Sequence, residues 1–344
     1  MQHFKYDVLS TYSTKTNLLL DNSQRLVSSR YPVRVSNYYA NLIKSNKDPI
    51  WKQCMPDSQE LDDFDQLADP LNESFLSPVN GLIHRYPNRV VLLVSNQCPV
   101  YCRFCMRKRL VGTTESQMTE EDFRKAISYI AANPTIRDVI LSGGDPLMLS
   151  DEALDRILSG IRSIEHVSII RIGSRVPVTL PERITPELCN LLKQFHPLYI
   201  NTHFNHPAEI TSASGAACSM LADAGIQLGN QSVLLKNVND DVDIMRQLMS
   251  NLLDIRVKPY YLHQMDLVRG TSHFRTSVET GLEIIKALRG HVSGLAVPHY
   301  VIDLPGGKGK VAILPDVMER DGDMLLLKTY TGETVKYQDI TAVQ

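Results

Sequence analysis

The regular alternation of short apolar runs with amphipathic stretches, from Arg89 to residue 302, is the feature that most constrains the fold. The run RVVLLVS (89–95) predicts a strand, because it is short, apolar and rich in valine. The stretch at 119–132 predicts a helix capped by Thr119, and a strand at 138–144 precedes a helix with Ser150 as its N-cap. The pattern continues with predicted strands at 167–174, 197–204, 227–235, 257–264 and 294–302, and predicted helices at 185–195, 214–225, 240–254 and 277–290.

Six strand–helix units in series predict an α/β protein with a parallel sheet. Because six units are too few for a complete eight-stranded barrel, we expect a partial (β/α)6 TIM-like barrel, with a doubly wound open sheet as the alternative. Both architectures gather functional residues at the C-terminal ends of the strands, where this sequence is polar. We expect a mainly helical or irregular extension over 1–80, with a helical stretch at 31–43. The barrel is then expected over 81–305, and a lysine loop with a short C-terminal segment over 306–344.

Charge and cysteine usage narrow the class of protein. The 36 Lys and Arg residues against 38 Asp and Glu give a net charge of −2, so no general electrostatic case for nucleic acid binding exists. The longest apolar runs are too short to cross a bilayer, and the N-terminus lacks the apolar region of a secretory signal. Cys54, Cys189 and Cys218 are scattered singly, without a disulfide framework. We therefore expect a cytoplasmic protein.

Three further cysteines lie together directly after the first predicted strand, at Cys98, Cys102 and Cys105. A structural zinc site usually takes four ligands, whereas three thiolates on one loop suit a 4Fe–4S cluster with one iron left open. Zinc with a remote fourth ligand, and three unconnected thiols, remain the alternatives.

Two glycine-rich stretches follow different strands. Gly143, Gly144 and Asp145 end the second strand, where the backbone can approach a ligand because no Cβ intervenes. The stretch VIDLPGGKGKVAILPD (301–316) fails the P-loop pattern because Val311 follows Lys310. A lysine among glycines also suits covalent binding of pyridoxal phosphate (PLP), while a basic loop that binds nothing is the alternative.

The cysteine spacing and the glycine pair resemble the radical S-adenosylmethionine (radical SAM) superfamily. From about residue 30 to 335 the chain closely resembles the lysine 2,3-aminomutase family, in blocks that include CPVYCRFCMRKRLVG, IRDVILSGGDPL, NTHFNHPAEIT and VIDLPGGKGK. The resemblance implies a barrel of the radical SAM type and three cofactors, namely a 4Fe–4S cluster, S-adenosylmethionine and PLP. It implies that the three clustered cysteines hold the 4Fe–4S cluster.

The resemblance also implies roles for other residues. S-adenosylmethionine would contact Gly143, Gly144, Asp145, Ser174, His203 and Gln231. PLP would be held by Arg85, Tyr86 and Arg89 and bound covalently by Lys310, the catalytic lysine, with any role of the nearby Lys308 left open. Substrate would contact Arg107 through its carboxylate and Asp266 and Asp303 through its side-chain ammonium.

The implied activity is that of an isomerase, an L-lysine 2,3-aminomutase that makes β-lysine by a 5′-deoxyadenosyl-radical 1,2-amino shift on a PLP aldimine. Two carboxylates favour lysine over glutamate as substrate, because like charges repel. The expected partners are L-lysine and an electron donor such as flavodoxin or ferredoxin, without nucleic acid or membrane, and a homo-oligomer is left open. The alternatives are a short-form aminomutase that serves β-lysylation of elongation factor P, and a non-catalytic Fe–S or zinc module.

Overall fold

The computed structural model describes residues 20–63, 66–113, 118–321 and 324–338, and its centre is one nine-stranded sheet. Neighbouring strands in the sheet follow the order of the sequence, and β2 to β8 run parallel. The two edge strands, β1 and β9, are antiparallel to their neighbours. The strands are β1 (Leu82–Tyr86), β2 (Arg89–Ser95), β3 (Asp138–Gly143), β4 (Ile169–Gly173), β5 (Leu198–Thr202), β6 (Gln227–Leu234), β7 (Lys258–Gln264), β8 (His299–Leu304) and β9 (Gly309–Ala312).

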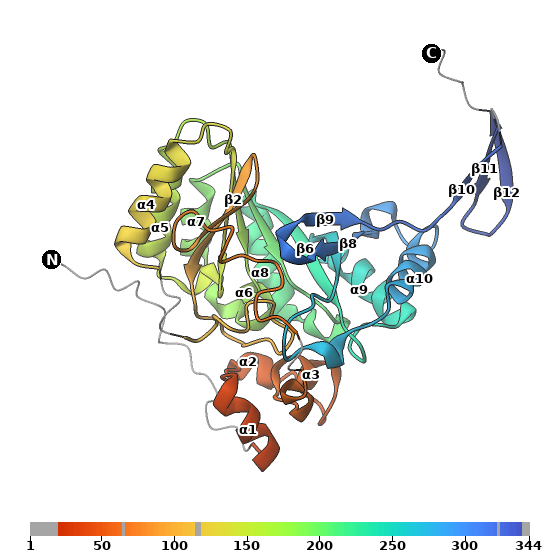
Figure 1. The fold of residues 1–344 in the computed structure, drawn as a ribbon, viewed down its shortest axis with the longest axis horizontal. Helices are drawn as coiled ribbons and strands as arrows, with labels where there is room; N and C mark the ends of the chain where they lie inside the picture. The colour runs from red at the N-terminus through yellow and green to blue at the C-terminus, as the bar shows by residue number, and fades with distance from the viewer. Residues whose placement is uncertain (1–19, 64–65, 114–117, 322–323, 339–344) are drawn as a thin grey trace.

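Each connection between neighbouring parallel strands carries a helix (Figure 1). These helices are α4 (Glu120–Ala131), α5 (Asp151–Arg162), α7 (Pro186–Lys193), α8 (Ser212–Asp223), α9 (Val242–Asp254) and α10 (Val278–Leu288), and the short α6 (Val176–Thr179) precedes α7. The predicted partial (β/α)6 barrel is confirmed. The doubly wound alternative is excluded, because its strand order reverses at a switch point and this order does not.

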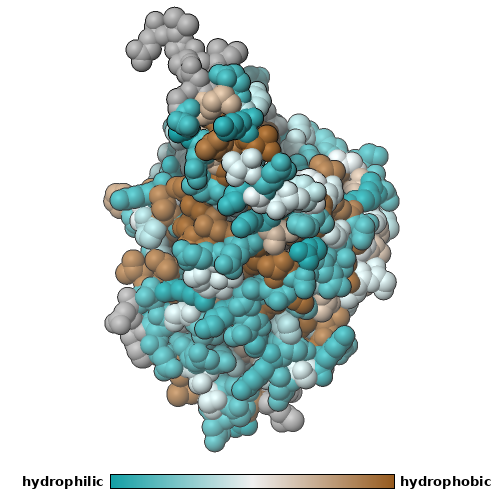
Figure 2. All heavy atoms as spheres, turned by 90° about the vertical axis from the view of Figure 1, so that its right-hand side faces the viewer, coloured by the Kyte–Doolittle hydropathy of each residue, from teal (hydrophilic) through white to brown (hydrophobic). Residues whose placement is uncertain are grey.

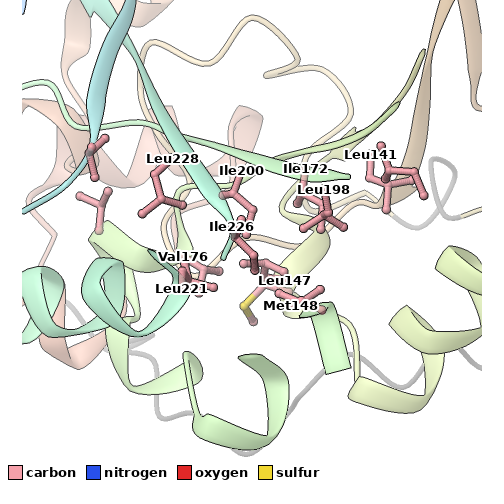
Figure 3. Packing of buried hydrophobic residues seen from close by; sticks show 14 of the residues in the cluster. Leu141, Leu147, Met148, Ile172, Val176, Leu198, Ile200, Leu221, Ile226 and Leu228 are labelled. Atoms are coloured by element: carbon pink, nitrogen blue, oxygen red, sulfur yellow. The ribbon is translucent and has the colours of Figure 1, made fainter. Parts of the chain in front are cut away.

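The core lies between the sheet and the helices. Successive side chains of a strand point to opposite faces, so the buried apolar residues of β2 are the alternate ones, Val90, Leu92 and Val94. Figure 3 shows the same layer farther along the sheet, where Leu141 and Ile200 from strands lie near side chains from the helical connections. The opposite face of the sheet is only partly buried, and it carries polar residues such as Ser142 and Arg171 together with apolar ones such as Val91.

The helix starts follow local chemistry. Thr119 caps α4 by accepting a hydrogen bond from the Asp122 backbone N–H, and Ser150 caps α5 by accepting one from Ala153. Both caps were predicted from the sequence. The predicted helical stretch at 31–43 is wrong for most of its length, because α2 spans only Asn37–Ala40.

The segment before α2 bonds to the barrel instead of forming a helix. The carbonyl of Arg34 accepts from the Tyr101 backbone N–H at 2.9 Å, and the Ser36 hydroxyl donates to the Thr179 carbonyl. These contacts satisfy polar groups that a longer helix would have used internally. The other described elements of the N-terminal extension are α1 (Asn22–Arg30), α3 (Pro49–Cys54) and the 3₁₀ turn η1 (Ser58–Leu61), and residues 1–19 of the predicted extension lie outside the described ranges.

The two edges of the main sheet face one another across a seam. The Arg85 guanidinium of β1 contacts Asp303 of β8 at 3.3 Å, and the Tyr86 hydroxyl accepts from the Lys310 backbone N–H of β9 at 2.8 Å. These contacts join strands that lie at opposite ends of the sheet order, so the barrel is nearly closed by side chains rather than by a strand ladder.

A separate three-stranded sheet ends the described chain and extends away from the barrel (Figure 1). It consists of β10 (Met318–Asp321), β11 (Met324–Lys328) and β12 (Thr334–Gln338), all antiparallel. Met318, Val335 and Tyr337 are exposed there, and Figure 2 shows hydrophobic areas among hydrophilic ones on that side of the molecule. Within the described ranges, no helix combines the length and the apolar character needed to cross a membrane.

Candidate active site

The cysteine loop follows β2 and is fixed by a buried cluster of three charges. Arg103 donates from Nε and Nη2 to the Glu60 carboxylate, and the Lys108 ammonium donates to the same carboxylate at 2.6 Å. Lys108 also donates to the carbonyls of Arg103 and Gly270 at 2.9 Å. Burial lowers the pKa of Lys108 to about 8, while the charge of Glu60 opposes that shift. The loop is therefore anchored to the turn η1 of the N-terminal extension.

The other two basic residues behind the cysteines also have acidic partners. Arg107 forms a two-bond ion pair with Glu73 at 2.7 and 2.9 Å, and Arg109 pairs with Asp69 at 2.9 Å. The basic stretch is therefore no open positive patch. Its charges hold the segment from Asp69 to Glu73 against the mouth of the barrel.

Arg107 keeps part of its hydrogen-bonding capacity. Nε and Nη2 donate to Glu73, and Nη1 donates to the Ser142 hydroxyl at 3.0 Å. A guanidinium has five N–H groups, so one N–H remains on each terminal nitrogen. These two N–H groups can donate charge-assisted hydrogen bonds to a carboxylate without loss of the Glu73 contact.

The three cysteines are half-buried free thiols on this one loop. Burial raises the pKa of Cys98 well above its usual value and that of Cys105 to about 11. In the described part of the chain no three His, Cys, Asp or Glu side chains converge as ligands of a single metal ion. A cubane cluster has a different requirement, because each thiolate binds its own iron and the sulfurs lie around the cluster. Three thiols from one loop fit that requirement.

The strand exit Gly143–Asp145 packs against the start of the cysteine loop. The backbone N–H of Gly144 donates to the Ser95 carbonyl, and that of Asp145 donates to the Gln97 carbonyl at 2.7 Å. A Cβ on Gly143 would lie 2.2 Å from the Ser95 oxygen, and one on Gly144 would lie 2.5 Å from the Gln97 oxygen. The glycines are therefore required by the approach of two backbone segments of this chain, a reason that the sequence did not reveal.

Asp145 and Ser174 bond to one another. The Asp145 carboxylate accepts from the Ser174 hydroxyl and the Arg175 backbone N–H at 2.7 Å, from Val176 at 3.0 Å and from Leu147 at 3.1 Å. Burial raises its pKa to about 6, although these donors oppose the shift. Both side chains organise the exits of β3 and β4, and a contact of either with S-adenosylmethionine stays a prediction.

His203 lies beside the cysteine loop and Gln231 lies farther along the sheet. The His203 ring centre is 5.6 Å from that of Phe104, and its buried Nε2 has no hydrogen-bond partner in the structure. Burial and then the charge of Arg175 lower the pKa of His203 well below its usual value, so the ring is neutral. An unpartnered buried nitrogen beside the cysteine loop fits a ligand placed there. Gln231 is half-buried on β6, at an irregularity in its pairing with β7.

The lysine loop lies on the barrel seam with the residues predicted to hold PLP. Arg89 stacks over the Tyr86 ring at 4.0 Å, and the Tyr86 hydroxyl accepts from the Lys310 backbone. The Lys310 ammonium forms an ion pair with Asp303, and both Lys308 and Lys310 are exposed residues. Arg85 contacts Asp303, and its buried Nε lacks a partner. This half of the site lies along the seam and the β1–β2 hairpin, not only at the C-terminal strand ends that we expected.

Two carboxylates with opposite pKa shifts lie in the same region. Burial, and then the nearby charge of Asp303, raise the pKa of Asp266 to about 7. Burial would also raise the pKa of Asp303, but the hydrogen bond from His263 and the charge of Lys310 hold it below its usual range. At neutral pH Asp303 is therefore ionised, and Asp266 is close to its titration midpoint.

Sequence analysis missed several residues of this region. Glu73 and Glu60 lie in the extension, where nothing local marks them as partners of the basic stretch. His263 also belongs to the site, because its Nδ1 lies 3.4 Å from Asp303. It is part of the polar strand end HQMD, and this polarity was the only sign in the sequence that the residue could have a function. Arg175 adjoins the predicted Ser174 and was also passed over.

The chain is similar to known proteins over most of its length. Residues 92–248 match the family model described as the radical SAM superfamily, and residues 285–342 match the one described as lysine-2,3-aminomutase. An L-lysine 2,3-aminomutase of Fusobacterium nucleatum is 51% identical over 309 residues, which are 89% of this chain and 73% of that protein. One from Methanococcus maripaludis is 53% identical over 89% of this chain and 72% of its own. A glutamate 2,3-aminomutase of Clostridioides difficile is 45% identical over 92% of this chain and 76% of its own.

Proposed function

Since this chain belongs to the lysine 2,3-aminomutase family of the radical SAM superfamily, we propose that it is the isomerase that converts L-lysine to β-lysine. The 4Fe–4S cluster, S-adenosylmethionine and PLP are the cofactors of such an enzyme, and together they supply the one-electron chemistry and the electron-accepting ring for a 1,2-amino shift. The chain itself binds and orients the substrate and keeps water from the reacting atoms.

We assign the cofactor sites to the groups described above. Cys98, Cys102 and Cys105 would hold the cluster. The strand exits around them, with Gly143–Asp145, Ser174, His203 and Gln231, would hold S-adenosylmethionine. Arg85, Tyr86 and Arg89 would hold PLP, and Lys310 would bind it covalently. The unpartnered nitrogens of His203 and Arg85 support both placements, because buried polar atoms in a finished site are normally satisfied.

The observation that carries the choice of lysine is the ion pair between the Lys310 ammonium and Asp303. In this pair the carboxylate accepts a primary ammonium at the barrel seam, with Asp266 nearby as a second acidic group, and this supports the choice of lysine. A substrate with a side-chain carboxylate would bring a further negative charge next to the ionised Asp303, which is unfavourable because like charges repel. At the other end, the two remaining N–H groups of Arg107 would take the substrate carboxylate.

The test is direct. Anaerobically reconstituted protein, supplied with dithionite, S-adenosylmethionine, PLP and L-lysine, should form β-lysine, detected by mass spectrometry. L-Glutamate should give no β-glutamate under the same conditions. Turnover of glutamate without turnover of lysine would overturn the choice of substrate while leaving the reaction class intact.

The raised pKa of Asp266 predicts how lysine turnover depends on pH. Below about pH 7 the carboxyl is protonated and offers no charge to the substrate ammonium, so kcat/KM for L-lysine should rise about tenfold per pH unit and level off above pH 7. The measurement is kcat/KM from pH 5.5 to 8.5. In Asp266→Asn the rising limb should disappear. A limb that persists unchanged in that variant would assign it to another group.

Several finer points belong to the same proposal. We place the enzyme in the cytoplasm, with flavodoxin or ferredoxin as its electron donor. Size-exclusion chromatography would test whether it forms a homo-oligomer. We also propose that residues 1–80, 81–305 and 306–344 act respectively as extension, barrel, and lysine loop with C-terminal segment. The ion pairs from Glu60 to the cysteine loop support a structural role for the extension in building the cluster site.

A further inference from the structure

Arg175, which follows β4, places its guanidinium against one of the three clustered cysteines. Nη1 donates to the Cys102 sulfur at 2.7 Å. Among the groups that the structure describes, Arg175 is the only charged side chain with a hydrogen bond to one of these sulfurs. The residue has no role in the proposed binding of S-adenosylmethionine, PLP or lysine.

The guanidinium is held in this position from several sides. Nε donates to the His203 carbonyl at 3.1 Å, and Nη2 donates to the Glu209 carboxylate at 2.7 Å. Nη2 also lies within hydrogen-bond distance of Gln53 and of the Tyr39 hydroxyl, two fully buried side chains of the N-terminal extension. The carbon of the guanidinium lies over the Tyr39 and Phe104 rings at 5.4 and 5.3 Å. With partners in so many segments, Arg175 cannot turn away from Cys102 without leaving buried polar groups unsatisfied.

Glu209 is itself fixed and offsets part of the charge. Its carboxylate is fully buried and accepts from the backbone N–H groups of Asn205 at 2.6 Å and His206 at 2.9 Å, and from the Tyr39 hydroxyl at 2.6 Å. The chain has therefore placed a cation on the sulfur and an anion directly behind it, both away from water.

We propose that Arg175 raises the reduction potential of the 4Fe–4S cluster through its bond to Cys102, and that Glu209 limits the increase. Reduction adds one electron to the cluster, so a nearby positive charge and an N–H donor to a ligand sulfur stabilise the reduced state. Arginine keeps its proton, so no proton transfer accompanies this effect. The inference rests on the proposed function only in that Cys98, Cys102 and Cys105 hold the cluster. Arg175 is a positioning and tuning residue, not a catalytic one.

The test is a redox titration of reconstituted protein without S-adenosylmethionine and lysine, followed by electron paramagnetic resonance of the reduced cluster. Arg175→Gln should lower the midpoint potential, so that at a fixed solution potential the ratio of reduced to oxidised cluster falls about tenfold, a shift of 59 mV. Glu209→Gln should shift the potential in the opposite direction. Arg175→Lys, which keeps the charge, should fall between wild type and Arg175→Gln. Arg171→Gln is the matched control, because Arg171 is an ion-paired arginine four residues earlier, on β4, whose partner is Asp138.

The opposite signs separate tuning from damage to the fold. Looser packing or added water would shift Arg175→Gln and Glu209→Gln in the same direction, and that result would overturn the proposal. An unchanged potential in an Arg175→Gln protein that still carries its full iron would do so as well. If Arg175→Gln binds no iron, the midpoint potentials of Glu209→Gln and Arg175→Lys test the proposal instead. A potential that does not rise in Glu209→Gln and does not fall in Arg175→Lys would overturn it. Shifted potentials without any β-lysine formation would instead refute the proposed substrate and leave this inference standing.

Discussion

Replacing Lys310 by arginine is expected to abolish covalent PLP binding and lysine turnover, whereas Lys308→Ala should retain both. The Lys310 ammonium reaches into the seam and pairs with Asp303, and its backbone is bound to Tyr86. Lys308 lies two residues away on the same glycine-rich loop and is exposed like Lys310, so the ion pair with Asp303 is what distinguishes Lys310. Arginine keeps a cation beside Asp303 and cannot form the imine linkage by which a lysine binds PLP. The measurement is the visible absorption band of protein-bound PLP, with retention of PLP after gel filtration as a second readout.

Lys308→Ala is the matched control for this prediction, because it removes a lysine from the same loop at little structural cost. A lost PLP band in Lys308→Ala, together with an intact band in Lys310→Arg, would reverse the assignment. Iron content should be the same in both variants, since neither residue contacts the cysteine loop. A loss of iron in Lys310→Arg would instead indicate a general failure of folding.

The parallel part of the fold could be predicted because its determinants are local. A strand that packs against helices appears in the sequence as a short apolar run. For this reason β2 could be predicted with its exact ends, Arg89 and Ser95. Helix caps such as Ser150 act within three residues. The antiparallel strands β1 and β9 were not predicted, because each is short and is defined by pairing at a sheet edge. The prediction of a helix over residues 31–43 was wrong for a related reason. Arg34 and Ser36 form hydrogen bonds with distant parts of the barrel, and the sequence does not show these contacts.

The site divides in the same way. Three cysteines within eight positions, or a lysine among glycines, carry their chemistry in the sequence itself. The residues that hold these side chains in place cannot be recognised in the sequence in the same way. Glu73 lies 34 positions from Arg107, and Gln53 lies 122 positions from Arg175. No spacing rule connects such pairs, because the tertiary fold alone brings them together.

Asp303→Asn is expected to lower kcat/KM for L-lysine by roughly 30- to 5000-fold, which corresponds to the ~2–5 kcal/mol lost when one partner of a buried charge pair is truncated. The Asp303 side chain is only 5% exposed, and it contacts Arg85, His263 and Lys310. Asparagine keeps the shape of the side chain and removes its negative charge. The three neighbouring groups and the substrate ammonium would then no longer have a carboxylate to pair with. Iron content should not change. The exposed Asp316→Asn is the control for a lost carboxylate in the same part of the chain.

The same variant can separate two functions of Asp303, because the residue could contact the substrate ammonium or merely hold Arg85 and Lys310 in place. L-Norleucine has a methyl group where lysine has its terminal aminomethyl group, so its affinity is independent of any contact with that ammonium. If Asp303 binds the ammonium, Asp303→Asn should weaken lysine binding far more than norleucine binding and should narrow the ratio of the two dissociation constants at least tenfold, or about 1.4 kcal/mol. If both amino acids lose affinity equally, Asp303 acts only by positioning its neighbours. Lysine specificity would then have to come from Asp266, and the pH dependence of lysine binding in Asp303→Asn would still show the titration of that carboxyl.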